Sequence, residues 1–114
     1  MRILLRSKIH RATVTGCNPD YSSSITLPRD LLEAADIAEF EQVHVLDVDN
    51  GERLITYAIA GDDSELVCVN GAAARKVNVG DKIIILAYEV GWEAQQPKIV
   101  KVDDSNRICG DVRC

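Results

Sequence analysis

Tyr21-Ser22-Ser23-Ser24-Ile25-Thr26-Leu27 is the stretch from which the organisation of the chain is best understood. Three consecutive serines stand between a turn-rich segment, residues 16–20, and a short apolar run. A serine hydroxyl at such a junction can attack the carbonyl of the preceding peptide bond, and this N→O acyl shift makes an ester that elimination can cleave. By itself, however, a run of three serines is typical of a polar turn.

Short strand patterns dominate the rest of the chain. Alternation of apolar and polar residues between turn clusters predicts strands at residues 1–7, 10–15, 24–27, 41–48, 53–59, 66–69, 82–88 and 97–102. Asn50-Gly51 is the strongest hairpin signal. Helical spacing after Pro28 predicts a short helix over residues 28–35, and residues 72–75 could form one helical turn. Many short strands with little helix indicate a mainly β fold, either a small closed barrel or a sandwich.

Length and charge limit the possible functions. The 114 residues, 46% of them hydrophobic, fit one folded domain, which we place at residues 1–102, followed by a polar tail at residues 103–114 that we expect to be mobile. The net charge is −5 and the chain has no basic block, which argues against a nucleic-acid partner. An acidic protein that binds an anionic substrate must use a local cation, so single Arg and Lys residues gain weight.

The N-terminal segment and the cysteines indicate a cytoplasmic protein without a metal. Arg6 and Lys8 interrupt the apolar run of residues 1–8, which is unlike a signal peptide. No stretch approaches the roughly 18–20 apolar residues that a membrane span needs. The four cysteines form no Cys-x-x-Cys pair and there are only two histidines, so we expect no metal site. We expect reduced cysteines, including Cys109 and Cys114 in the tail.

Three further segments change the interpretation of the serine run: Lys8-Ile9-His10-Arg11, Arg53-Leu54-Ile55-Thr56-Tyr57-Ala58-Ile59-Ala60 and Val69-Asn70-Gly71-Ala72-Ala73-Ala74. In type, order and spacing, the four segments resemble the pyruvoyl-dependent aspartate 1-decarboxylases, from about residue 1 to about residue 88. The resemblance implies a six-stranded double-psi β-barrel that assembles as a homotetramer. It implies decarboxylation of L-aspartate to β-alanine and CO2 for pantothenate biosynthesis, after self-cleavage between Ser23 and Ser24 converts Ser24 to a covalent pyruvoyl group. A maturation helper protein is a further possible partner.

The resemblance also assigns roles to residues around Ser24, whose pyruvoyl carbonyl would form a Schiff base with the substrate. Arg53 would hold the substrate carboxylate, because a guanidinium offers a bidentate fork. Thr56 would stabilise the oxyanion formed during cleavage, and Tyr57 would return a proton to carbon. The remaining substrate-binding positions are Asn70, Gly71, Ala72, Ala73 and Lys8. Neighbouring strand residues point to opposite faces, so Thr56 and Tyr57 can share a site only through a strand twist or a subunit boundary.

Ser23 departs from the family pattern, which has glycine before the reactive serine. A serine in a left-handed conformation there would cost roughly 1–2 kcal/mol and could either slow or help cleavage. Two other hypotheses therefore remain open. The chain could be a non-processing relative that binds a small ligand or a protein, or an unrelated small β-barrel binding module.

Overall fold

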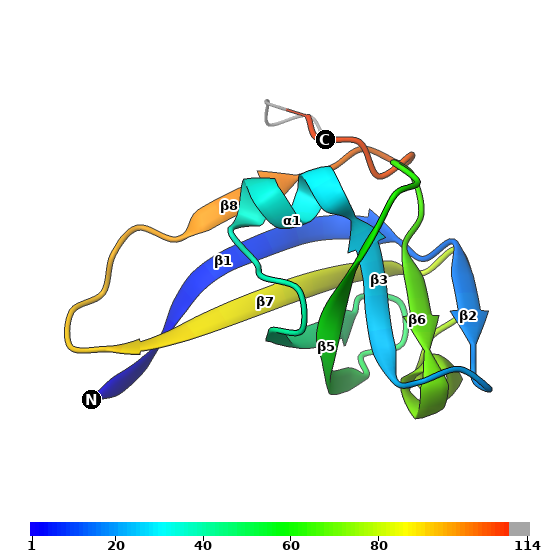
Figure 1. The fold of residues 1–114 in the computed structure, drawn as a ribbon, viewed down its shortest axis with the longest axis horizontal. Coiled ribbons are helices and arrows are strands. Elements are labelled where there is room, and N and C mark those ends of the chain that lie inside the picture. The colour runs from blue at the N-terminus through cyan, green and yellow to red at the C-terminus, as the bar shows by residue number, and fades with distance from the viewer. Residues whose placement is uncertain (110–114) are drawn as a thin grey trace.

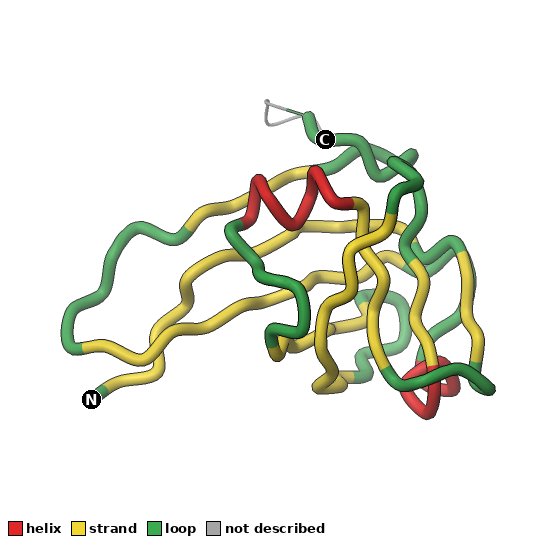
Figure 2. The backbone as a smooth tube through the Cα atoms, viewed as in Figure 1, coloured by secondary structure: helices red, strands yellow, loops and turns green. Residues whose placement is uncertain are grey.

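The computed structural model describes residues 1–109 of the chain as ten short elements (Figure 1). In chain order they are β1 (Arg2–Thr13), β2 (Gly16–Asn18), β3 (Ser24–Pro28), α1 (Arg29–Ala35), β4 (Gln42–Asp47), β5 (Arg53–Gly61), β6 (Cys68–Asn70), the 3-10 helix η1 (Gly71–Lys76), β7 (Lys82–Gly91) and β8 (Lys98–Lys101). Strands make up most of this regular structure, as the tube in Figure 2 shows. The prediction of a mainly β fold is therefore confirmed.

The strands pair in the order β2-β6-β3-β5-β4-β7-β1-β8, and this row returns on itself. Only Val14 and Thr15 separate β1 from β2 along the chain, so one continuous segment joins the first strand of the row to the last but one. The Thr15 amide donates to the Val67 carbonyl at 2.8 Å, which ties this joint to the segment before β6. The result is a small barrel-like fold. It has eight strands where the resemblance implied six, since short pieces such as β2 count separately.

The core of the barrel follows from alternation along the strands. On β7, Ile83, Ile85 and Ala87 are fully buried, while the residues between them are only half-buried. Each large aliphatic side chain buried in this way contributes roughly 1.5–3 kcal/mol. α1 lies along β8, β1 and β3 and buries Leu31 and Leu32, so the helix covers one side of the strands (Figure 1).

Most predicted elements are found with shifted boundaries. The strands predicted at residues 1–7 and 10–15 form the single strand β1. Its pairing with β7 shifts register twice, between Leu5 and Ser7 and between Ile9 and Ala12, and the strand continues through both shifts. Part of the predicted turn at residues 16–20 forms β2, which pairs in parallel with β6. Asn50-Gly51 does connect β4 to β5, with Gly51 at a φ of 77°. The helical turn predicted at residues 72–75 is the 3-10 helix η1.

Residues 103–109 of the tail predicted at 103–114 contact the barrel; the remainder lies outside the described residues. Asn106 is 1% exposed. Its side chain donates to the carbonyls of Thr13 and Glu65, each at 2.9 Å, and accepts the Thr13 amide at 2.7 Å. This part of the tail is therefore anchored to the end of β1. Cys109 is disulfide-bonded, contrary to the expectation that it is reduced.

Two other predictions concern the membrane and the remaining thiols. Cys17 and Cys68 are free. Within residues 1–109, no helix has the length and apolar character needed to cross a membrane.

Candidate active site

Ser24 is the first residue of β3 and is almost fully buried, at 2% exposure. The antiparallel pairing of β3 with β6 places it opposite Asn70, whose Nδ2 donates to the Ser24 Oγ at 3.0 Å. The Ser24 hydroxyl donates in turn to the carbonyl oxygen of Ser22 at 3.3 Å. The same Asn70 amide also donates to the Thr26 Oγ1 at 3.2 Å, which fixes its orientation. The hydroxyl predicted to be reactive is thus held in place, next to the peptide bond that it would attack.

Ser23 lies against the backbone of Gly71, the first residue of η1. Gly71 has a φ of 72°, and a Cβ added there would lie 2.4 Å from the Ser23 Oγ and 2.5 Å from its Cα. Only glycine fits at position 71, both for its conformation and for the space. Among the described residues, the non-glycine residues with positive φ are Arg11, Asp36, Phe40 and Asn106. Ser23 therefore does not adopt the left-handed conformation considered for it, and the associated strain is not found.

A cavity of about 470 Å³ opens beside Ser23. Its lining comes from the start of β5 and from η1, together with Ser23 itself: Ser23, Arg53, Leu54, Ile55, Thr56, Ala72, Ala73 and Lys76. Five of these residues were predicted as site residues. Lys76 was not predicted. The available signal was a cation at the end of the Ala-rich turn, in a chain expected to bind an anion. Its Nζ lies 3.4 Å from the Glu52 Oε2, and both side chains are about half exposed.

Thr56 and Arg53 give the cavity its chemistry. Thr56 faces inward on β5, is 8% exposed, and its Oγ1 has no hydrogen-bond partner within residues 1–109. A buried hydroxyl without a partner is available to donate to an oxygen that develops negative charge in the cavity. Arg53 is exposed, and its Nη1 lies 3.2 Å from the His44 Nδ1. The cavity therefore offers a cation to an anionic ligand and a free hydroxyl to an oxyanion.

Tyr57 and Lys8 lie outside this cavity. Tyr57 is half-buried on the opposite face of β5 from Thr56, and its ring centroid is 6.4 Å from that of Phe40. Lys8 lies on β1 between Ser7 and Ile9, whose side chains are buried, so the Lys8 side chain points away from the core of the barrel. In the strand order, β1 and β5 are separated by β7 and β4, which puts Lys8 three strand spacings, or roughly 14 Å, from β5. The parallel pairing of β3 with β5 sets Ile25 beside Ala58, which places Tyr57 beside Ser24 and on the same face. Lys8, in contrast, is not brought to Ser24 within one chain.

His10, in the same segment as Lys8, lies on β1 and is half-buried. Its Nδ1 has no hydrogen-bond partner among the described residues. Burial lowers the pKa of His10, and the positive charges of Lys8, Arg11 and Lys101 lower it further. His10 is therefore biased toward its neutral form.

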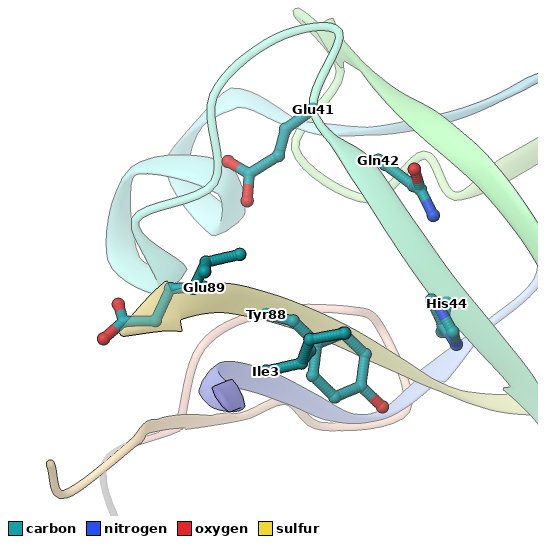
Figure 3. Close-up of a pocket in the computed structure, with 7 residues that line it drawn as sticks. Ile3, Glu41, Gln42, His44, Tyr88 and Glu89 are labelled. Atoms are coloured by element: carbon teal, nitrogen blue, oxygen red, sulfur yellow. The ribbon is translucent and has the colours of Figure 1, made fainter. Parts of the chain in front are cut away.

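A second cavity of about 350 Å³ contains none of the predicted site residues (Figure 3). Its lining residues are Ile3, Glu41, Gln42, His44, Tyr88, Glu89 and Val90. His44 and Tyr88 make an edge-to-face contact with ring centroids 4.9 Å apart. Glu41 is ion-paired with Arg6. Ile3 and Val90 are 78% and 63% exposed, so this cavity belongs to an apolar outer surface rather than to the serine site.

Comparison with known proteins gives a consistent result. A family model described as aspartate decarboxylase matches residues 1–109. The chain is 53% identical over 110 residues to the aspartate 1-decarboxylase of Caldicellulosiruptor saccharolyticus, covering 92% of this chain and 86% of that protein. It is 54% identical over 113 residues to aspartate 1-decarboxylase 1 of Gloeobacter violaceus, covering 95% and 96%. With the corresponding enzyme of Acetivibrio thermocellus, identity is 54% over 110 residues, covering 92% and 87%.

Proposed function

The chain belongs to the aspartate decarboxylase family, and from this premise we propose that it is a pyruvoyl-dependent enzyme that converts L-aspartate to β-alanine and CO2 for pantothenate biosynthesis. The observation that carries the proposal is the placement of the buried Ser24 hydroxyl, bonded to Asn70, next to a cavity that holds Arg53 and the unpartnered Thr56 hydroxyl. We place the reaction in the cytoplasm.

Maturation begins with the Ser24 hydroxyl. Its Oγ attacks the carbonyl carbon of Ser23, the C–N bond between the two residues breaks, and an ester joins Ser23 to the Ser24 side chain. Thr56 donates to the Ser23 carbonyl oxygen as that oxygen becomes negative, and its lack of another partner supports this role. Elimination then releases Ser23 as a carboxylate and leaves a dehydroalanine at position 24. Hydrolysis by water expels ammonia and leaves the pyruvoyl group at the N-terminus of the larger fragment.

The residues around Ser24 fit such a group. It would occupy the start of β3, beside Asn70 and the cavity, and it supplies an electron-accepting carbonyl for loss of CO2. Gly71 leaves the room that a Cβ would fill. Ala72 and Ala73 line the cavity with small side chains, so a substrate can approach the backbone of η1. Arg53 binds the substrate's side-chain carboxylate, which keeps the carboxylate at the other end free to leave.

The complete site needs a second subunit. Lys8, as a cation for the substrate, lies outside the cavity of its own chain, whereas Tyr57, as proton donor, lies beside Ser24 on the neighbouring strand. The outer face of β1, β5, β7 and β8 carries exposed apolar residues of the kind that subunit interfaces bury, namely Ile3, Ile55, Val90 and Ile99. We propose a homotetramer in which one subunit presents residues such as Lys8 to the cavity of its neighbour. A helper protein for maturation fits the same scheme if cleavage of the isolated chain is slow.

The intact mass of the purified, denatured chain tests the proposal. We expect two fragments, split between Ser23 and Ser24, with the larger one carrying a keto function in place of its N-terminal amine. The cleaved protein should release CO2 from L-aspartate, and hydroxylamine should abolish that activity because it reacts with the carbonyl. Ser24→Ala should remain uncut and inactive. A single uncut mass after prolonged warming, both alone and in extracts of the source cells, would instead support a non-processing relative.

A further inference from the structure

Three aspartates converge at the end of the barrel where β4 and β7 meet. Asp47 is the last residue of β4, Asp49 lies in the following hairpin, and Asp81 directly precedes β7. The antiparallel pairing of β4 with β7 places Asp47 opposite Ile83, which brings the two acidic segments together. One carboxylate oxygen of each aspartate lies within 4.8 Å of those of the other two. None of the three residues lines the cavity beside Ser23.

Asp47 has a buried carboxylate oxygen without a hydrogen-bond donor among the described residues. The residue is 3% exposed. Its Oδ1 accepts the backbone amides of Asp49 at 2.8 Å and of Asn50 at 3.2 Å. Its Oδ2 has no hydrogen-bond donor within residues 1–109. Because Oδ1 is used by the hairpin, Oδ2 is the atom that remains for the other two carboxylates. A buried carboxylate oxygen without a partner is unfavourable, so this position calls for a bound cation or a proton.

Within residues 1–109, no positive side chain is paired with the three aspartates. Burial raises the pKa of Asp47, and the adjacent Asp81 carboxyl group raises it further, whereas the proximity of Asp47 lowers the pKa of Asp81. None of the ion pairs found in the described part of the chain joins Asp47, Asp49 or Asp81 to a Lys or Arg side chain. Lys82, the nearest cation in sequence, directs its Nζ to the Thr13 Oγ1 at 2.6 Å and to Asp104 at 2.7 Å. The carboxylates are therefore close together and lack a counter-charge among the described side chains.

We propose that Asp47, Asp49 and Asp81 bind a hard divalent cation of the Ca²⁺, Mg²⁺ or Mn²⁺ class. Such ions prefer carboxylate oxygens and complete their coordination with water. The second and third ligands are already oriented by the backbone. The Lys82 amide donates to the Asp49 Oδ2 at 2.8 Å, and the Asn78 amide donates to the Asp81 Oδ2 at 3.0 Å. Each of these carboxylates keeps one oxygen for the ion.

The ion would join the β4–β5 hairpin to the start of β7. The same hairpin is tied to η1, since the Asn50 Nδ2 donates to the Lys76 carbonyl at 2.8 Å. The site is thus a structural clamp at the base of the hairpin that leads into Arg53. It takes no part in the decarboxylation chemistry.

The test is cation binding to the full-length chain after treatment with EDTA and removal of the chelator. CaCl2, MgCl2 and MnCl2 are titrated separately by calorimetry, and the melting temperature is measured with and without each salt. We expect one ion per chain and a higher melting temperature for at least one of the three salts. Asp49→Asn should weaken binding at least tenfold and remove the thermal shift, and Asp49 is exposed, so this variant should fold. Asp62→Asn removes the same charge from an exposed position and should bind as the unaltered chain does.

Two results would overturn the proposal. One is the absence of heat and of any thermal shift with all three salts at about 10 mM, above the weakest dissociation constants of ordinary calcium modules. In that case, stability that rises as pH falls would show that Asp47 and Asp81 share a proton instead. The other is equal binding by Asp49→Asn and the unaltered chain, since the ion would then be bound elsewhere.

Discussion

Replacing Gly71 by alanine tests the contact between η1 and the cleavage site. Two costs can be separated. The positive φ of 72° penalises any L-residue by roughly 1–2 kcal/mol. In addition, the new Cβ would meet the Ser23 Oγ, Cα and N at 2.4–2.6 Å, and overpacking of this kind costs roughly 1–3 kcal/mol. Ser22 and Ser23 are exposed, so the chain relieves the overlap most easily by moving Ser23 away.

That movement displaces the carbonyl which Ser24 must attack. If the 1–3 kcal/mol appears in the barrier to cleavage, the rate falls roughly 5- to 150-fold. The assay follows the conversion of freshly purified precursor to two fragments on denaturing gels, and urea unfolding reports stability in parallel. Gly80→Ala is the matched control, because Gly80 has a φ of 96° and an added Cβ there meets nothing within 4 Å. It should lose a similar 1–2 kcal/mol of stability yet cleave normally. Cleavage of Gly71→Ala at the unaltered rate would refute the argument that Ser23 is held against position 71.

Three further substitutions separate cleavage, turnover and stability. Thr56→Val should slow cleavage roughly 10²- to 10³-fold, as measured by the same gel assay, because an oxyanion donor is lost, whereas Thr56→Ser should retain most of the rate. Tyr57→Phe should cleave normally but lose turnover of L-aspartate in a CO2-release assay, and full turnover would remove Tyr57 as the proton donor. Asn106→Ala should lower the free energy of unfolding by about 1–3 kcal/mol in urea titrations, because the carbonyls of Thr13 and Glu65 lose the donor that the buried Asn106 side chain supplies. An unchanged midpoint would mean that the tail does not anchor β1.

Local patterns predicted the elements well, because they depend on short-range chemistry. The Asn50-Gly51 turn and the alternation along β7 each reflect a property of neighbouring residues, and both are found. The continuity of β1 could not be predicted, since it depends on irregular pairing with β7, whose partner residues lie 69 to 89 positions away. The anchoring of Asn106 depends in the same way on contacts with Thr13, which no local pattern encodes.

The candidate site was predictable to the extent that it lies within one chain. Motif positions identified Ser23, Arg53 and Thr56, and these line one cavity. Strand periodicity also predicted correctly that Thr56 and Tyr57 face opposite sides of β5. Lys76 was not found because its placement depends on where η1 ends relative to β5. The gap between Lys8 and the cavity reflects a different limit. In the proposed homotetramer a second chain completes the site, and such a site is encoded on two separate surfaces of each chain.

This division suggests that maturation and turnover have different structural requirements. Ser24, Asn70, Thr56 and Gly71 lie together in one chain, so we expect cleavage to proceed within it, whereas the proposed homotetramer would bring Lys8 from a neighbour. Co-expression of differently tagged Lys8→Ala and Arg53→Ala chains tests this directly. Each alone should cleave but bind L-aspartate poorly. In equal mixtures, a site that combines an intact Arg53 with an intact Lys8 from the adjacent subunit should arise at about a quarter of positions, the product of two one-half probabilities. Mixed oligomers should therefore recover roughly that fraction of activity. If Lys8 and Arg53 served the same site from one chain, every site would lack one of them and no activity would return.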